Sequence, residues 1–512
     1  MVFEILFILN LILLFVYYMH MFQLNSYFFK KYMHWFNQSK KGIITRTILS
    51  LLPAILYLFN NTCKVIAFII LTISIIYNIP KKKAKISIKF TKRVNRMFVT
   101  EAILMVIILI LNSFVKNTNL IYIVLSILAP FMCIIANFIN KPIEHRINMY
   151  YINDAKRILA EQKDLLVIGV TGSYGKTSVK NFLYQMLSKK YEVLQTPKNY
   201  NTTMGVVRTI RENLKPYHQI FICEMGATKV NDIKEICDLV HPKLGVITAI
   251  GPQHLQSFKS IDNIIKTKFE LADAVAEAGG KIFLNCNNEY INSNKDKYDF
   301  VSYGVNDDKL EYNAHDIKMD ANEKSFKVKD KRTFEDVKFE TNIIGKQNIM
   351  NLTGAMAVAN YLGIDLKTLK PVVRKMQNVE HRLQPIHNGN VTIIDDAYNS
   401  NPISSKYAID TLKEFNGTRI IVTPGLIELG DEQSKYNYEF GEYMGKNCDY
   451  IYIVKSPCEK DMVDGIKATD FDNSKLFKTN SAKSAVQEIT NMHLKGEVVI
   501  LLENDLPDNY NV

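Results

Sequence analysis

The segment from Val167 to Ser178 constrains the fold more than any other, because an apolar run ends in a glycine-containing loop and a helical pattern follows at once. The loop reads Gly-Ser-Tyr-Gly-Lys-Thr over residues 172–177. A strand that stops at such a loop aims backbone N–H groups and the N-terminus of the next helix at one point, where a polyphosphate can bind. Val170 stands where the usual phosphate loop has glycine, so the spacing is a shorter variant.

In this interpretation Lys176 reaches the outer phosphates and Thr177 offers its hydroxyl to Mg²⁺. The alternative is a glycine-rich turn that binds nothing, but the order of strand, Gly-Lys-Thr and helix favours the phosphate site. The predicted nucleotide-binding residues of the loop are Gly172, Ser173, Tyr174, Gly175, Lys176, Thr177 and Ser178.

Strand and helix patterns alternate after this loop, which predicts an α/β fold with a largely parallel sheet. Ligands gather at the carboxyl ends of such strands, where Gly172, Glu224 and His254 are all expected. Residues 300–343 are predicted to form short strands in an antiparallel excursion. A second α/β unit begins near Gly345 and contains no further phosphate loop, so this unit is expected to form the other wall of a cleft. The predicted helices cover about 230–240, 260–278 and 345–362, and the predicted strands 219–223, 244–250, 281–285, 391–395, 418–423, 449–454 and 497–502.

The N-terminal region is different in kind. Apolar runs near membrane-spanning length predict about five spans within residues 1–140, and buried core helices are the less natural alternative. Loops 20–46 and 80–97 carry five and eight basic residues, whereas the other loops carry one at most, so the basic loops and everything after 140 are expected in the cytoplasm. The weakest span is 47–60, which is short and contains Pro53; without it the count is four.

Composition excludes some classes of protein. Residues 1–150 hold 17 Lys and Arg against three Asp and Glu, so the net charge of +12 belongs to the membrane region, and nothing indicates a nucleic-acid surface. Seven widely spaced cysteines without a C-x-x-C pair suggest neither a zinc site nor a disulfide framework.

Lys268 interrupts the apolar stripe of the predicted helix 260–278. A lysine there is expected either to reach past the stripe into solvent or to hold its amine in a polar, metal-containing cleft. The pattern alone leaves both readings open.

Nine motifs, in order, make the chain resemble the Mur ligases, and among them the branch that adds D-alanyl-D-alanine to the peptidoglycan precursor. The resemblance covers about 165–505. The motifs are Thr-Gly-Ser-Tyr-Gly-Lys-Thr (171–177), Thr-Pro-Lys-Asn-Tyr-Asn (196–201), Glu-Met-Gly-Ala (224–227), Ile-Gly-Pro-Gln-His-Leu (250–255), Lys-Phe-Glu (268–270), Gly-Lys-Gln-Asn (345–348), His-Arg-Leu (381–383), Asp-Asp-Ala-Tyr-Asn-Ser-Asn-Pro (395–402) and Glu-Leu-Gly (428–430).

The apolar runs and the mixed-charge segment after them give a transmembrane helical region (1–140) and a linker helix (141–163). The resemblance implies a central P-loop ATPase domain (164–343) and a C-terminal Rossmann-like domain (344–512). It implies ATP-dependent amide formation through an acyl phosphate, with Mg²⁺ at two sites and with Lys268 as a carbamylated lysine. The implied catalytic residues are Lys176, Lys268, His254 and Arg382; the implied metal ligands are Thr177 and Glu224 for the first Mg²⁺ and His254 for the second. The implied further nucleotide contacts are Asn348, Arg382 and Asp396, and the implied substrate contacts are Asn199, Asn201, Tyr398, Asn399 and Asn401.

In that family an N-terminal domain binds the uridine nucleotide of the precursor. In this sequence the membrane region stands in the place of that domain. The expected partners are therefore a cell-envelope precursor, nucleotide-linked, lipid-linked or polymeric, and an amino acid or dipeptide, at a multi-pass membrane protein with cytoplasmic catalytic domains. Two alternatives stay open: an amino-acid polymer ligase of poly-γ-glutamate or folyl-polyglutamate type, and a non-catalytic nucleotide-binding membrane scaffold.

Overall fold

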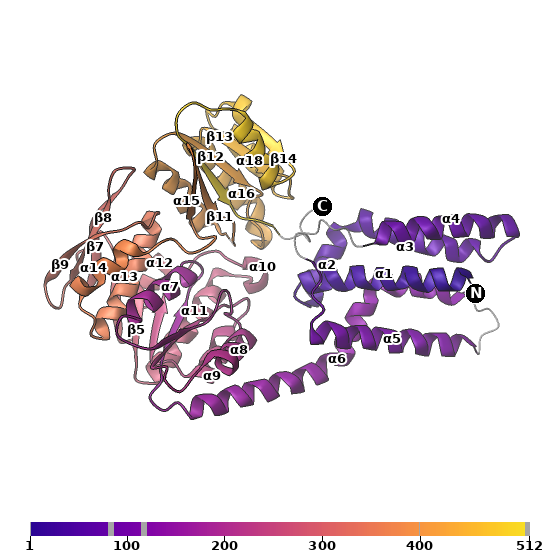
Figure 1. Ribbon diagram of the computed structural model, residues 1–512, viewed down its shortest axis with the longest axis horizontal. Helices are drawn as coiled ribbons and strands as arrows, with labels where there is room; N and C mark the ends of the chain where they lie inside the picture. Colours follow the sequence, from indigo (N-terminus) through magenta and orange to yellow (C-terminus); the bar gives the residue numbers. More distant parts are fainter. Residues whose placement is uncertain (1, 80–86, 114–119, 399, 507–512) are drawn as a thin grey trace. The chain divides into compact units, whose positions relative to one another are not determined.

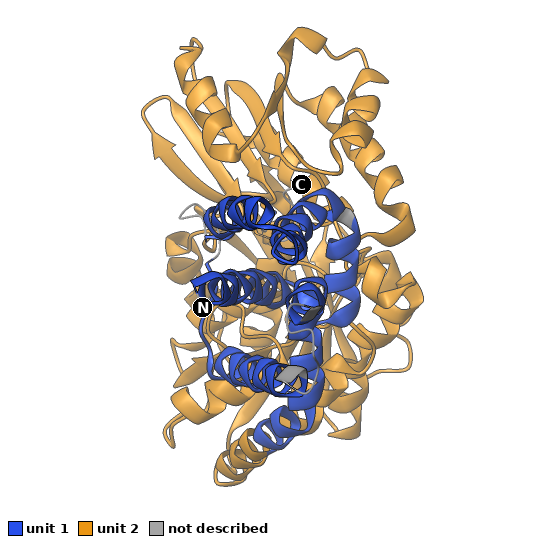
Figure 2. Cartoon of the chain, turned by 90° about the vertical axis from the view of Figure 1, so that its right-hand side faces the viewer, with its two compact units in different colours: residues 1–149, 506–512 blue, residues 150–505 orange. Residues whose placement is uncertain are grey.

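The computed structural model describes residues 2–79, 87–113, 120–398 and 400–506. The chain forms two compact units, one up to Met149 and one from Tyr150 to Asp505 (Figure 2). Part of the predicted basic loop 80–97, the whole of the predicted loop 116–119 and the candidate Asn399 lie outside the described residues.

The first unit is helical (Figure 1). A network of buried polar side chains joins four of its helices: Asn10 donates to Ser50 (3.1 Å) and accepts from Ser74 (2.8 Å), and the hydroxyls of Ser50 and Ser126 lie 3.0 Å apart. Hydrogen bonds of this kind hold helices together where no water competes. The helices are α1 (Val2–Leu24), α2 (Phe29–Gln38), α3 (Lys40–Leu56), α4 (Asn61–Asn78), α5 (Lys92–Ser113) and α6 (Leu120–Ala160).

Within the described residues, four helices are long and apolar enough to cross a membrane: α1, α4, α5 and α6. The predicted fifth span corresponds to α3, which has 17 residues and contains Pro53. The predicted linker helix 141–163 is the continuation of α6 and not a separate helix.

Among the described residues of the second unit, nine strands form the first sheet in the order β2-β3-β1-β4-β5-β6-β7-β8-β9. Helices α7, α13 and α14 cover one face, and α8, α9, α11 and the end of α6 cover the other. The strands are β1 (Leu166–Thr171), β2 (Val193–Gln195), β3 (Ile220–Glu224), β4 (Leu244–Ile247), β5 (Lys281–Asn285), β6 (Phe300–Val305), β7 (Tyr312–Met319), β8 (Lys324–Asp330) and β9 (Glu335–Glu340). The helices are α7 (Lys176–Leu187), α8 (Thr203–Asn213), α9 (Asp232–Val240), α10 (Leu255–Phe258), α11 (Ile261–Glu277), α12 (Glu289–Asn292), α13 (Lys346–Tyr361) and α14 (Leu366–Lys375).

Two details differ from the sequence-based expectation. Strands β6 and β7 extend the parallel sheet, and only β7–β9 form the antiparallel excursion. Helix α13, expected at the start of the second α/β unit, packs into the core of the first sheet through Ile349, Leu352 and Met356. Its continuous apolar character gave no signal of which sheet it would cover.

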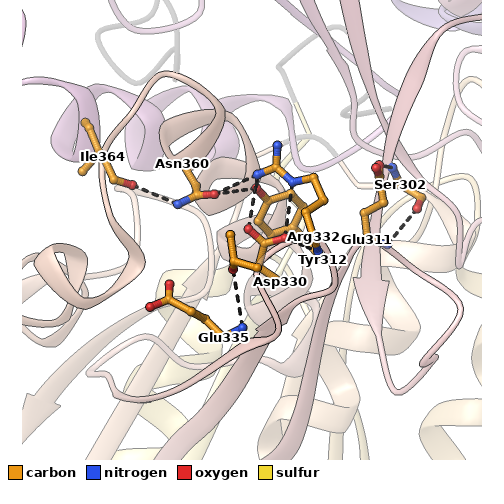
Figure 3. Close-up of polar contacts among 9 residues, drawn as sticks. Ser302, Glu311, Tyr312, Asp330, Arg332, Glu335, Asn360 and Ile364 are labelled. Atoms are coloured by element: carbon orange, nitrogen blue, oxygen red, sulfur yellow. Dashed lines mark hydrogen bonds and ion pairs between the residues drawn. The ribbon is translucent and has the colours of Figure 1, made fainter.

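A polar cluster fastens the antiparallel excursion to the end of α13 (Figure 3). The Tyr312 hydroxyl donates to Asn360 Oδ1 (2.6 Å), and Arg332 donates to Asn360 (2.9 Å) and to the carboxylate of Asp330 (3.2 Å). Asn351, in the first half of α13, contacts Gly175 of the phosphate loop, so the polar cluster holds the helix that forms one side of the site.

The second sheet has six strands in the described chain, in the order β10-β11-β15-β12-β13-β14, parallel except for β10. The strands are β10 (Gln384–Asn388), β11 (Val391–Asp396), β12 (Thr418–Thr423), β13 (Tyr450–Val454), β14 (Leu476–Thr479) and β15 (Val498–Glu503). Helices α15 (Pro402–Thr411), α16 (Gln433–Asn447) and α17 (Glu459–Lys467) pack on one face, and α18 (Ala482–Asn491) packs on the other.

Candidate active site

The phosphate loop lies between β1 and α7 as predicted. Gly172 has a φ of 154° and lies so close to the chain after β4 that a Cβ there would be 2.1 Å from Thr248 Oγ1, so only glycine fits. The Ser173 hydroxyl donates to the Gly251 carbonyl (3.0 Å), which ties the loop to the segment that carries His254. Gly175 precedes α7 in a left-handed conformation without a side-chain cap, so the first N–H groups of the helix are available to an anion.

Lys176 closes over its own loop and donates to the carbonyls of Gly172 (2.6 Å) and Ser173 (3.1 Å). Burial lowers the pKa of Lys176 to about 8, with Glu224 opposing this shift and Arg382 adding to it. The charge of Arg382 acts on Lys176, so a second cation is within electrostatic range of the phosphate loop, an arrangement that favours the binding of a polyphosphate.

Glu224, at the carboxyl end of β3, is the carboxylate of the site and is buried. Thr177 and Asn201 donate to its Oε1 at 3.2 and 3.1 Å, and the ammonium of Lys180 lies 2.9 Å from Oε2. Burial alone would raise the pKa of Glu224, but Lys180 and Lys176 hold it below its usual value, so the group is a carboxylate. The Thr177 hydroxyl and this carboxylate are hard oxygen donors beside a phosphate loop, a set that fits Mg²⁺.

His254 follows β4 and meets Glu428, its Nδ1 bonded to the Glu428 carboxylate. Both residues have positive φ, 54° and 62°, a backbone strain that is common at functional sites. A carboxylate on Nδ1 fixes the tautomer that leaves the lone pair on Nε2, which is how metal-binding histidines are oriented. His254 therefore fits the second metal site, with Glu428 as its orienting group.

Lys268 lies on α11 and is buried; its amine makes no hydrogen bond or salt bridge to the residues that the structure describes. Burial, and then the charge of Lys176, hold the pKa of Lys268 well below its usual value, while Asp232 and Glu270 oppose the shift. Glu270 instead accepts the backbone N–H groups of Asn231 (2.7 Å) and Lys234 (2.8 Å). The reading of Lys268 as a lysine that reaches solvent is therefore wrong.

Asn348 lies at the start of α13 and accepts from Asn351 (3.2 Å), whose side chain packs against Gly175. The candidate adenine contact is thus next to the phosphate loop. The side-chain amide of Asn348 donates to the Ile344 carbonyl (3.0 Å), and this hydrogen bond orients the Asn348 side chain.

The second sheet contributes the remaining candidates. Arg382 stacks on the ring of Tyr398, 4.2 Å from its centroid, and the Tyr398 hydroxyl accepts from Asn199 (2.8 Å). Asn401 caps α15 by accepting from the backbone of Ile403 and Ser404, a structural role, yet its buried Nδ2 has no hydrogen-bond partner among the residues that the structure describes.

Asp396, at the end of β11, forms a carboxyl pair with Glu503 at the end of β15. Ser400 donates to Glu503, whose Oε2 is buried and has no hydrogen-bond partner in the described part of the chain. Burial raises the pKa of Asp396 to about 6, with Arg382 opposing the shift, and burial and Asp396 raise the pKa of Glu503.

Sequence reasoning missed Lys180, Glu428 and Glu503. Lys180 is one helical turn after Lys176, a spacing that places both on one face of α7. Glu503 ends a predicted strand, where ligand-binding residues gather. Glu428 had no local signal beyond the Glu-Leu-Gly motif, because its partner is 174 residues away.

Comparison with known proteins identifies the family. The Mur ligase middle domain matches residues 170–359, and the Mur ligase, glutamate ligase domain matches residues 381–502, together more than half of the chain. The chain belongs to the Mur ligase family.

Two of the relatives carry the same name. A Bacillus subtilis (strain 168) protein named UDP-N-acetylmuramoyl-tripeptide--D-alanyl-D-alanine ligase is 30% identical over 278 residues, 54% of this chain and 59% of the relative. The protein of that name from Escherichia coli (strain K12) is 27% identical over 320 residues, 60% of this chain and 70% of the relative. The chain thus spans less than two thirds of the Bacillus relative's length.

Solved structures show the same fold. MurF from Acinetobacter baumannii superposes with a TM-score of 0.63 at 23% identity, over 70% of this chain and 77% of that one. MurF from Thermotoga maritima, solved in complex with ADP, superposes with a TM-score of 0.61 at 22% identity, over 70% of this chain and 80% of that one.

Proposed function

We propose that the protein is a membrane-anchored ATP-dependent ligase that joins the amine of an amino acid or dipeptide to a carboxylate of a cell-envelope precursor. The observation that carries the proposal is the convergence, in one unit, of a phosphate loop, the Thr177–Glu224 oxygen pair, His254 and the cation Arg382. A non-catalytic scaffold has no need of a second metal position or of a buried amine beside the phosphate loop.

The chemistry follows from the charges. A carboxylate is a poor electrophile, and transfer of the γ-phosphoryl group to it gives an acyl phosphate with a good leaving group. Lys176 and Arg382 neutralise the charge that develops on the transferring group. Thr177 and Glu224 would hold one Mg²⁺ and His254 the other, and the metal supplies further positive charge there. The amine then displaces phosphate, and the amide forms.

Lys268 is proposed as a carbamylated lysine. Only a neutral amine adds CO₂, and the depressed pKa of Lys268 increases the fraction of the amine in that form. The resulting anion would replace the electrostatic repulsion between a buried ammonium and the nearby Lys176 by attraction. It would also place a carboxylate-like group toward the metals.

The proposed carboxyl substrate is a muramoyl tripeptide presented at the membrane, and the proposed amine is D-alanyl-D-alanine. The names of the relatives support the two substrates. The helices of the first unit, which precede both family domains, support presentation at the membrane, where a lipid-linked form of the precursor would be found.

We also propose five membrane crossings, with α3 among them. The Arg46 guanidinium of α3 lies 4.6 Å from the ring centroid of Tyr77, near the end of α4, and α3 then runs back beside α4 to the turn at Asn60 (Figure 1). It thus covers nearly the same length as α4. A reporter at Val512 should be cytoplasmic and one at the N-terminus outside; a cytoplasmic N-terminus would mean four crossings.

The test uses the full chain purified in detergent with Mg²⁺ and ATP. D-Alanyl-D-alanine is added with either the UDP-linked or the polyprenyl-linked muramoyl tripeptide. The expected result is ADP release and a product heavier by one dehydrated dipeptide, faster with the lipid-linked acceptor. Faster turnover of the UDP-linked acceptor would overturn membrane presentation, and ATP binding without any amide product would favour the scaffold.

A further inference from the structure

Lys180 is a buried lysine beside the site to which neither the family resemblance nor the mechanism assigns a role. It lies on α7 one turn after Lys176 and is 1% exposed. Its ammonium makes two contacts: an ion pair with Glu224 Oε2 at 2.9 Å and a hydrogen bond to the backbone carbonyl of Lys198 at 2.6 Å. The second contact reaches a segment of chain that contains none of the phosphate-binding groups.

That segment is the loop 196–201, which carries Asn199 and Asn201. Lys198 has a φ of 46°, a conformation that non-glycine residues rarely adopt. A charge-assisted hydrogen bond to its carbonyl therefore stabilises an intrinsically unfavourable turn.

The loop has contacts on both sides of the site. On one side Asn201 donates to Glu224 Oε1 (3.1 Å), and its carbonyl accepts from the Gly226 N–H (2.7 Å). On the other side Asn199 donates to the hydroxyl of Tyr398 (2.8 Å), which stacks with Arg382. Lys180 is the charged group that links the metal-binding carboxylate to this loop.

We propose that Lys180 is a positioning residue: it holds the loop 196–201 against Glu224, so that Glu224 directs Oε1 toward Thr177 and Asn199 meets Tyr398. Lys180 does not contact the nucleotide phosphates in this account. Its effect on turnover rests on the proposed function, whereas its effect on the loop does not.

A purely structural lysine is the alternative, and the two differ in what a substitution changes. Loss of a structural ion pair lowers the stability of the whole unit. Loss of a positioning residue loosens one loop and weakens the use of substrates more than the binding of ATP.

Hydrogen exchange of the full chain in detergent, without substrates, tests the effect on the loop. In Lys180→Met the amides of Tyr200, Asn201 and Gly226 should exchange about tenfold faster, as expected when a charge-assisted hydrogen bond is lost, while β3 stays protected. Lys190→Met is the matched control, because Lys190 also donates to the carbonyl of a left-handed residue, Gly363 (3.0 Å), away from the site.

A second pair of variants covers the case in which the uncompensated Glu224 prevents folding of Lys180→Met. Lys180→Met combined with Glu224→Gln removes both charges, and Glu224→Gln alone keeps the bond from Lys180 to Lys198. Fast exchange in the double variant but not in Glu224→Gln supports the proposal. Unchanged exchange in the double variant overturns it, whether or not the protein proves to be a ligase.

Kinetics separate the two roles. For Lys180→Met, kcat/KM for the carboxyl and amine substrates should fall about 100-fold, the usual cost of a small misplacement, while KM for ATP changes less than about threefold. Lys180→Arg, which keeps the cation, should recover part of this loss. Equal losses for all three substrates, or a loss explained by the folded fraction alone, would return Lys180 to a structural role.

Discussion

The carboxyl ends of the parallel strands form one edge of each sheet, and the buried side chains at these two edges are of opposite charge type. At the first edge the buried or partly buried groups are the cations Lys176 and Lys180 with the carboxylate of Glu224 among them, and the amine of Lys268, whose pKa is held well below its usual value. At the second edge they are the carboxyls of Asp396 and Glu503. Both sheets are parallel at this edge, so the fold alone does not produce the difference.

The difference assigns the partners. In the proposed function the polyphosphate binds at the first edge, where Lys176 attracts it, since an ionised carboxyl pair at the second edge would repel it. The second edge instead offers acceptors, suited to hydroxyl or amine groups, with Arg382 as its cation toward the phosphates. The first edge therefore supplies cations for the phosphates, and the second edge supplies hydrogen-bond acceptors. Substitutions can change one edge at a time.

The largest effect is expected from Lys176→Ala, which removes the cation of the phosphate loop. Turnover should fall by at least about 10³-fold because the developing charge is no longer neutralised, while the fold persists. ADP release with both substrates measures this, and circular dichroism checks the fold. ADP release at nearly the wild-type rate would show that the phosphates bind elsewhere.

Lys268→Met keeps the aliphatic stem and removes the amine. The pKa of the uncarbamylated, buried amine is below that of an unfolded lysine, so unfolding takes up a proton at pH values between these two pKa values. Below the pKa of the unfolded lysine the native state is therefore less stable than it would be with an apolar side chain. We expect Met to raise the unfolding temperature at pH 7, with a gain that shrinks as pH rises toward 10. Ligation should be lost if a carbamate supports the metals.

Full amide formation by Lys268→Met would contradict the carbamate and leave Lys268 as a buried structural amine. Lys268→Ala provides the second arm: bicarbonate cannot restore activity without an amine, whereas short carboxylic acids should restore part of it by occupying the vacated space.

Glu503→Gln tests the acidic edge. The pKa values of Asp396 and Glu503 are raised in the folded protein, so folding takes up protons and stability falls as pH rises above about 4. Glutamine keeps the shape and removes one of the two charges. The variant should be more stable than the wild type by about 1–2 kcal/mol at pH 8 and nearly equal at pH 4. Calorimetry at the two pH values is the measurement, and a gain independent of pH would argue against the pair.

Ser400→Ala gives the smallest effect. It removes the hydroxyl that donates to Glu503 and leaves the carboxyl pair otherwise intact. Stability should fall by about 1 kcal/mol with little change in kcat. A loss of activity much larger than the loss of stability would show that Ser400 contacts a substrate directly.

Local patterns in the sequence were sufficient for the phosphate loop and for most strands of both sheets. The Gly-Lys-Thr segment follows β1 as predicted, and the apolar run near 418–423 is β12. Such elements are specified by neighbours in the chain, namely glycines that only one backbone conformation accommodates and alternating apolar residues.

What the sequence left open depends on contacts between distant residues. Which sheet α13 covers is decided by packing around Leu352, and the partner of His254 is Glu428, far along the chain. Periodicity placed Lys268 on an apolar stripe but gave no information on its neighbours. Only the folded chain shows that Lys176 lies close to it and that Glu270 is already bound elsewhere.

The central claim is that the two edges together activate a carboxylate by phosphorylation, and oxygen-18 tests it most directly. The carboxyl substrate is labelled with oxygen-18 and incubated with the full chain, Mg²⁺, ATP and the amine. If an acyl phosphate forms, one labelled oxygen passes to inorganic phosphate in each turnover, and mass spectrometry of the phosphate detects it. Amide product accompanied by unlabelled phosphate would contradict the account, because the carboxylate would then have been activated by another route.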